Sequence, residues 1–215
     1  MISQRELKRQ WRRSAIARRK RTSVEQRQDA GRLLAMRARE ASLVRPRSTI
    51  AAFVSMGSEM SMTPLLGMML DSSCRVLVPR LGAGMDIGWS ALDAIDDLRD
   101  QRNADGSRNI RRPQEPDNDV DGPEALAEAA LIIVPAFAVD EQGFRLGRGG
   151  GWYDRALRYR NPSSHVIAVC WPWEPTDEAV PHEPHDIPVD GVLTPEGYSA
   201  TSADRMVTGR SQGTY

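Results

Sequence analysis

Cysteine and long apolar runs are both scarce in this chain of 215 residues, and each scarcity excludes a class of protein. The two cysteines, Cys74 and Cys170, lie far apart in apolar stretches and lack the spacing of metal ligands. We therefore expect buried, reduced thiols rather than a disulfide or a zinc site, which fits a cytoplasmic protein. No uncharged apolar run approaches the length of a membrane span, and the amino terminus has no apolar signal-peptide core, so neither membrane insertion nor export is expected.

The formal net charge of zero conceals two oppositely charged parts. Residues 1–47 contain 15 lysines and arginines against 4 aspartates and glutamates, so the remaining chain contains 14 against 25. The first part therefore carries about +11 and the rest about −11. A basic arm of this kind could bind nucleic acid, dock on the acidic body or supply cations to a phosphate ligand, and charge alone does not decide among these functions.

Short apolar runs alternate with helical segments along the chain, a pattern typical of α/β proteins. The length and the 40% hydrophobic content suffice for one sizeable core. We expect strands at 48–54, 74–78, 85–89, 131–134 and 166–170, helices at 64–70 and 124–129, and a polar surface excursion at 93–123. Together they predict a single three-layer α/β domain over residues 1–198, with a largely parallel central sheet and a ligand beyond the carboxyl ends of the strands.

Two basic amino-terminal helices are expected to precede this core as an arm over residues 1–44. The first spans Gln4 to Arg19. The second starts at a capping box formed by Thr22 and Glu25 and runs to about residue 41. At the other end, residues 199–215 contain almost no apolar side chains, so we expect a disordered tail.

The most informative segment is Arg145-Leu-Gly-Arg-Gly-Gly-Gly-Trp-Tyr-Asp154, which leads from a strand and a loop into a helix that begins near Trp152. Its four glycines can present backbone N–H groups to an anion without obstruction, and the helix start adds a positive dipole end. Arg145 and Arg148 offer guanidinium groups to phosphate oxygens, and Asp154 could hold a magnesium ion beside them. The segment favours a phosphoryl-transfer site over a simple tight turn.

Two familiar nucleotide-binding loops do not match this segment. A Walker A loop ends in Gly-Lys-Ser or Gly-Lys-Thr, and neither is present. The dinucleotide fingerprint, counted from Gly147 and Gly149, needs a third glycine at the position of Trp152. Neither a P-loop enzyme nor an NAD enzyme is therefore expected.

The stretch from Val134 to Asp154, with Asp140, Gly143 and Arg145 between them, resembles the signature of the 5-formyltetrahydrofolate cyclo-ligase family, also called methenyltetrahydrofolate synthetases. Weaker similarities follow the family's order over most of the chain, at Lys8 and Arg12, 53–59, 78–80, 109–113 and 185–190. The resemblance implies ATP-dependent cyclisation of 5-formyltetrahydrofolate to 5,10-methenyltetrahydrofolate, with ADP and phosphate released after phosphorylation of the formyl oxygen. It implies Mg²⁺ as cofactor and small molecules as partners, and we expect a monomer that binds neither nucleic acid nor membrane.

The resemblance also implies a role for each candidate site residue. Arg148 and Tyr153 would be catalytic, and Asp154 and Asp186 would share the magnesium ion. ATP would contact Lys8, Arg12, Arg145, Leu146, Gly147, Arg148, Gly149, Gly150, Gly151, Trp152 and Tyr153. The folate would contact Val54, Glu59, Arg148, Gly149, Gly150, Gly151 and Trp152, with the Glu59 carboxylate accepting hydrogen bonds from the pterin ring.

Two other functions are compatible with parts of the sequence. A relative that kept the fold but lost the reaction would serve as a folate- or nucleotide-binding module, although the joint presence of Lys8, Glu59, Arg148 and Asp154 speaks against it. An RNA-binding protein could use the basic arm, but the sequence contains no nucleic-acid-binding motif.

Overall fold

The computed structural model of the chain describes residues 3–81, 87–183 and 186–203. Its main sheet consists of β1 (Thr49–Ala51), β2 (Arg75–Leu81), β3 (Ile87–Leu92), β4 (Leu131–Pro135), β7 (His165–Val169), β9 (Gly191–Thr194) and β10 (Gly197–Ala200). The strand order is β10-β9-β7-β4-β1-β2-β3. The five inner strands run parallel, whereas β10 and β3 pair antiparallel at the two edges. The expected largely parallel sheet is therefore confirmed.

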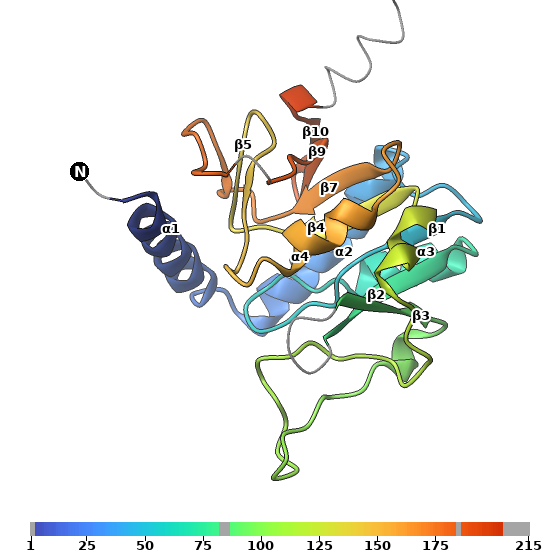
Figure 1. The fold of residues 1–215 in the computed structure, drawn as a ribbon. Coiled ribbons are helices and arrows are strands. Elements are labelled where there is room, and N and C mark those ends of the chain that lie inside the picture. The colour runs from blue at the N-terminus through green and yellow to red at the C-terminus, as the bar shows by residue number, and fades with distance from the viewer. Residues whose placement is uncertain (1–2, 82–86, 184–185, 204–215) are drawn as a thin grey trace, which may run out of the picture.

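Strand β4 shows how the sheet separates two helical layers. Its successive side chains point to opposite faces, as in any strand. Leu131 and Ile133 pack with α2 (Val24–Glu40) and α3 (Thr63–Asp71). Ile132 and Val134 pack on the other face, with the 3-10 helices η2 (Pro123–Glu128) and η3 (Leu157–Tyr159) and with α4 (Trp152–Ala156). This gives the expected three-layer α/β fold (Figure 1).

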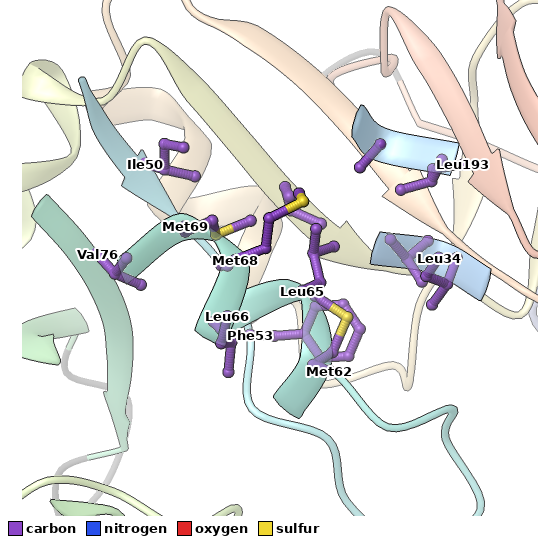
Figure 2. Close-up of a cluster of buried hydrophobic side chains, with 14 of the residues drawn as sticks. Leu34, Ile50, Phe53, Met62, Leu65, Leu66, Met68, Met69, Val76 and Leu193 are labelled. Atoms are coloured by element: carbon purple, nitrogen blue, oxygen red, sulfur yellow. The ribbon is translucent and has the colours of Figure 1, made fainter. Parts of the chain in front are cut away.

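The layer that contains α3 is unusually rich in methionine. Met62 and Met69 are fully buried beside Leu65 and Leu66. Figure 2 shows these side chains gathered with Ile50 and Val76 of the sheet and with Leu34 of α2. Because methionine is flexible and apolar, it fills irregular space between a short helix and a twisted sheet.

Both expected amino-terminal helices are present, but α2 packs into this core and does not stand apart as an arm. Ala30, Leu34 and Ala38 are buried against the α3 layer. A Cβ atom on Gly31 would lie 2.2 Å from the carbonyl oxygen of Ser61, so α2 approaches that backbone closely. The net positive charge of residues 1–47 obscured this apolar stripe.

The start of α2 also differs from the expectation by one residue. Ser23 and Gln26 form the capping box, in which Ser23 Oγ accepts from Gln26 N at 3.1 Å and Gln26 Oε1 accepts from Ser23 N at 2.8 Å. The Thr22 hydroxyl instead donates to the carbonyl of Arg19. Thr22 with Glu25 and Ser23 with Gln26 both satisfy the capping-box pattern, so the sequence could not separate them.

Helix α1 spans Gln4–Arg19, as predicted, and stands apart from the layered body (Figure 1). Trp11 and Ala15 pack against a small apolar cluster that contains Phe137 and Leu146. This cluster belongs to a second sheet, made of β6 (Arg145–Leu146), β5 (Ala138–Asp140) and β8 (Pro175–Thr176) in that order. Only α1 therefore behaves as an appended arm.

The boundary expected at residue 198 is wrong, because Ser199 and Ala200 belong to β10 and Thr201 is buried. Pairing with β9 orders these polar residues, since the backbone supplies the hydrogen bonds. Residues 204–215 of the expected tail, 85–86 of the expected third strand and His185 lie outside the described residues. No helix in the described part of the chain is long and apolar enough to cross a membrane.

Candidate functional site

A cavity of about 750 Å³ lies at the carboxyl ends of the parallel strands. Phe53 and Val54 follow β1, Ala136 and Phe137 follow β4, and Leu81 ends β2, and all five line the cavity. This is where the sequence placed the ligand, because loops that follow parallel strands meet at one edge of the sheet. Every candidate site residue lines the same cavity, namely Lys8, Arg12, Val54, Glu59, Arg145, Leu146, Gly147, Arg148, Gly149, Gly150, Gly151, Trp152, Tyr153, Asp154 and Asp186.

The glycine loop forms one wall of this cavity. Gly149 and Gly151 have φ angles of 97° and 62°, a region that favours glycine. Gly147 and Gly150 leave open space, since a Cβ atom at either position would meet nothing within 4 Å. Helix α4 follows the loop but spans five residues, so its dipole adds less than a long helix would. The exposed backbone of the loop is thus better suited to receive an anion than the short helix that follows it.

Helix α1 brings two cations, Lys8 and Arg12, to the cavity from more than a hundred residues away in the chain. The Nε atom of Arg12 donates to the carbonyl oxygen of Gly147 at 2.8 Å. Lys8 Nζ lies 3.8 Å from the Oδ2 atom of Asp186. Desolvation by burial lowers the pKa of Arg12. Because residues four apart share a helix face, both cations point to the body and not to solvent.

Arg148 and Glu59 form an ion pair inside the cavity. Arg148 Nη2 lies 2.9 Å from Glu59 Oε1, and its Nε lies 3.2 Å from the same oxygen. The other carboxylate oxygen of Glu59 accepts from the backbone N–H of Met56 at 2.9 Å. The Glu59 side chain is 5% exposed and that of Arg148 is 46% exposed. The carboxylate is therefore fixed, whereas the guanidinium has room to turn toward a ligand.

Arg145 occupies a more enclosed position than the sequence suggested. Its Nη2 lies 2.5 Å from Asp154 Oδ1, and its Nη1 donates to the carbonyl of Ile187 at 2.7 Å. The side chain is 4% exposed, and this burial lowers the pKa of its guanidinium against the opposing effect of Asp154 and Asp186. Arg145 thus ties the start of α4 to the segment that contains Asp186, and its fork is not open to phosphate.

The chemistry of the two aspartates fits a magnesium ion that is held together with a nucleotide. Asp154 and Asp186 both line the cavity on the side of Arg145. Within the described part of the chain, no group of three or more His, Cys, Asp or Glu side chains is placed to hold a metal ion. Mg²⁺ is commonly bound by one or two carboxylates, with phosphate oxygens and water completing the octahedron. Two carboxylates are therefore a donor set compatible with Mg²⁺ whose other ligands are phosphate oxygens and water.

Tyr153 is placed to donate a hydrogen bond in this site. Burial raises the pKa of its phenol, and the nearby carboxylate of Glu59 raises that pKa further. The group stays neutral at any physiological pH, so it can donate but cannot serve as a phenolate base. Trp152 packs edge-on against Tyr153 and Trp89, with ring centroids 4.8 and 5.2 Å apart, and so supports the wall behind the loop.

Some residues that line the cavity were not anticipated from the sequence. Phe137 follows β4, and its ring centroid lies 4.4 Å from the guanidinium carbon of Arg19 and 5.8 Å from that of Arg148. Its position directly after a buried strand was a usable signal, since that is where cavity residues are expected. Ile110, from the polar excursion, also lines the cavity although it is largely exposed. Its segment was marked only as a weaker similarity to the family, without a role for this side chain.

Comparisons with known proteins identify the family of this chain. The 5-formyltetrahydrofolate cyclo-ligase family matches residues 4–195. A 5-formyltetrahydrofolate cyclo-ligase of Mycolicibacterium smegmatis is 37% identical over 69% of this chain and 74% of its own, and that of Escherichia coli K12 is 30% identical over 83% and 94%. The solved 5,10-methenyltetrahydrofolate synthetase of Aquifex aeolicus shares the fold, with a TM-score of 0.71 and 24% identity over 90% of this chain and 92% of its own. This chain therefore belongs to the 5-formyltetrahydrofolate cyclo-ligase family.

Proposed function

We propose that this protein converts 5-formyltetrahydrofolate to 5,10-methenyltetrahydrofolate and couples the ring closure to the cleavage of ATP. The observation that carries the proposal is the convergence in one cavity of an open glycine loop, cations from α1 and two carboxylates. Such a site neutralises phosphate charge and aligns two ligands, which phosphoryl transfer requires. Folate and one-carbon metabolism is the corresponding context.

The reaction needs activation because a formamide oxygen is a poor leaving group. In the family's reaction, the γ-phosphoryl group of ATP moves to the formyl oxygen and ADP is released. The second folate nitrogen then attacks the formyl carbon and loses its proton, and the bond from that carbon to oxygen breaks as phosphate departs. No protein nucleophile is required, so the protein acts mainly by placing the formyl oxygen in line with the γ-phosphate.

Each group of residues has a distinct task in this mechanism. Lys8 and Arg12 bind phosphate oxygens that lie against the backbone N–H groups of the glycine loop. Glu59 accepts hydrogen bonds from the pterin ring, and its buried position fixes the ring beside Val54. Arg148, released from Glu59 by the folate, stabilises charge on the transferred phosphoryl group. The neutral Tyr153 donates a hydrogen bond to the formyl oxygen.

Asp154 and Asp186 are proposed to hold Mg²⁺ at the phosphates of ATP. A bound magnesium ion would neutralise charge on the β- and γ-phosphate oxygens. Arg145 fixes the Asp154 carboxylate through the 2.5 Å contact, and Lys8 lies at 3.8 Å from that of Asp186. The protein thereby keeps both acidic groups at one side of the cavity.

Near-ultraviolet absorbance tests the proposed function directly, because closing the methenyl ring creates an extended chromophore that the substrate lacks. We expect absorbance to rise only when the protein receives 5-formyltetrahydrofolate, magnesium and ATP together. Detectable ATP binding without a rise would favour an inactive relative that binds ligands. If neither ligand binds, the RNA-binding alternative gains weight, and a gel shift with steep salt dependence would support it.

Replacing Asp154 or Asp186 by asparagine is expected to raise the magnesium concentration required for half-maximal activity by about tenfold or more. Even the loss of a group that only orients a metal ligand lowers metal affinity by about 10- to 100-fold. Asparagine keeps the side-chain shape, so the Asp154→Asn variant would still offer an oxygen to Arg145. The measurement is a magnesium titration of the initial rate in Asp154→Asn and Asp186→Asn. Asp29→Asn, on the exposed face of α2, serves as the control and is expected to titrate like the unmodified protein. An unchanged titration in either site variant would refute the role of that residue.

We also propose a cytoplasmic location and a monomeric state. The two free, buried cysteines suit a reducing compartment. The candidate site residues of a single chain line one shared cavity, which supports the proposal of a monomer.

A further inference from the structure

Helix α1 presents a polar stripe to the rest of the protein. Lys8, Arg12, Ala15 and Arg19 follow one another at intervals of four, three and four residues, which places them on one helix face. Three of these four side chains are cationic, and the fourth is small. The apolar contacts of the helix, through Trp11 and Ala15, are therefore few. Specific polar contacts must fix its orientation.

Arg19 makes the most enclosed of these contacts. Its Nε and Nη2 atoms each lie 2.6 Å from an oxygen of Glu174, so the pair is bidentate. Nη2 also donates to the carbonyl oxygen of Ala136 at 2.5 Å, directly after β4. Glu174 in turn accepts from the backbone N–H of Trp171 at 2.8 Å. Arg19 is 3% exposed and Glu174 is buried as well, so this pair is shielded from water.

The surroundings of the pair restrict Arg19 further. Its guanidinium carbon lies 4.4 Å from the centroid of the Phe137 ring, which also lines the cavity. The neighbouring Arg18 stacks over Trp173 at 4.6 Å, and Trp173 stacks on Trp171. The carboxyl end of α1 is thus held on the segment 171–174 and on the end of β4. No comparable buried ion pair holds the other end of α1 within the described residues.

We propose that Arg19 is a positioning residue for ATP binding, which through its buried pair with Glu174 orients α1 so that Lys8 and Arg12 reach the nucleotide phosphates. The inference rests on the proposed function, because it assigns those two cations to ATP. Arg19 acts through them and not on the ligand, since its Nε and Nη2 atoms are bound to Glu174 and Ala136.

Because α1 is long, a small tilt at its carboxyl end, at Arg19, displaces its amino-terminal part by a large distance. Lys8 precedes Arg19 by 11 residues, or roughly 16 Å along the helix axis, at nearly the same angle around it. A tilt of about 10° at Arg19 would therefore move the Lys8 end by roughly 3 Å. Displacements of about 1 Å at a reacting site can change rates by two orders of magnitude. A small tilt of α1 at Arg19 is therefore enough to move Lys8 away from the phosphates.

The test uses two variants, because removing one member of a buried ion pair leaves an unpaired charge that can unfold the protein. Arg19→Met is the single variant. Arg19→Met/Glu174→Gln removes both charges, while glutamine keeps an oxygen for the Trp171 N–H. Arg13→Met, which removes an exposed cation of the same helix, is the matched control. The readouts are the KM values for ATP and for 5-formyltetrahydrofolate, together with the thermal unfolding midpoint.

We expect the double variant to unfold near the temperature of the unmodified protein, with KM for ATP raised by about tenfold or more and KM for the folate within about twofold. Lys8→Ala should raise KM for ATP in the unmodified protein but add little in the double variant, because residues that act through one another are not additive. Arg13→Met should leave both KM values unchanged.

Two results would overturn the inference in different ways. A folded double variant with a normal KM for ATP, in which Lys8→Ala still has its full effect, would show that the pair contributes stability alone. If Lys8→Ala and Arg12→Ala have no effect on KM for ATP in the unmodified protein, the assignment of these cations to ATP fails and the inference fails with it. The absorbance assay of the unmodified protein decides the proposed reaction separately from both.

Discussion

Replacing Arg148 with alanine is expected to lower kcat by about 100- to 1,000-fold, the usual effect of removing one charge-stabilising donor from a transition state. The residue pairs with Glu59 at 2.9 Å, yet it is 46% exposed and can turn toward the phosphoryl group. Because the assigned contact forms fully only as phosphate charge develops, KM for ATP should change much less than kcat. Steady-state kinetics with ATP as the varied substrate measures both quantities.

The partner of Arg148 supplies the control for this experiment. Glu59→Gln removes the charge that the guanidinium neutralises, but it leaves Arg148 in the cavity. We expect this variant to raise KM for 5-formyltetrahydrofolate, since glutamine replaces one acceptor oxygen by a donor. Arg148→Lys should recover part of the lost rate, because the charge returns without the fork. A kcat for Arg148→Ala within about threefold of normal would exclude a transition-state role, given the much larger losses such donors produce.

Replacing Gly143 with alanine is expected to lower the free energy of unfolding by about 3–5 kcal/mol, through backbone strain together with a steric collision. Gly143 has a φ angle of 91°. A Cβ atom there would lie 2.2 Å from the carbonyl oxygen of Val189 and 3.1 Å from the hydroxyl oxygen of Thr201. The turn between β5 and β6 would have to separate from the segment that leads into β9. Urea denaturation at equilibrium measures the change.

The Gly106→Ala variant separates the contribution of backbone strain to the loss of stability from that of the steric collision. It also has a positive φ angle, of 80°, but a Cβ atom there would meet nothing within 4 Å. Gly106→Ala should therefore cost about 1 kcal/mol from backbone strain alone. If Gly143→Ala were no more destabilising than Gly106→Ala, the close approach of the turn to Val189 would not exist in solution.

The local elements could be predicted closely because their signals lie within a few residues. Helix α1 begins and ends at Gln4 and Arg19, as the spacing of its residues indicated. The apolar run at residues 131–134 became β4, and a short helix begins at Trp152. Caps, apolar periodicity and glycine-rich turns act over one or two helical turns, so the sequence displays them directly.

The sequence also indicated which residues would share a cavity, but it did not indicate their contacts. A continuous motif placed Arg145, Arg148, Tyr153 and Asp154 together, and the structure brings all of them to one cavity. It also shows that Arg145 is buried against Asp154, whereas Arg148 remains partly exposed beside Glu59. Which of two arginines is enclosed depends on the segments that fold over them, and those segments are distant in the chain.

The alternation of strands and helices, the glycine loop and the family could be recognised from the order of residues, because these depend on local periodicity and a contiguous motif. The packing of α2 into the core, the separate position of α1 and the pairing of Arg19 with Glu174, 155 residues away, became visible in the folded protein alone. A charged side chain is stable in the interior only beside a partner and hydrogen-bonding groups. Where that partner lies is set by the packing of the whole chain.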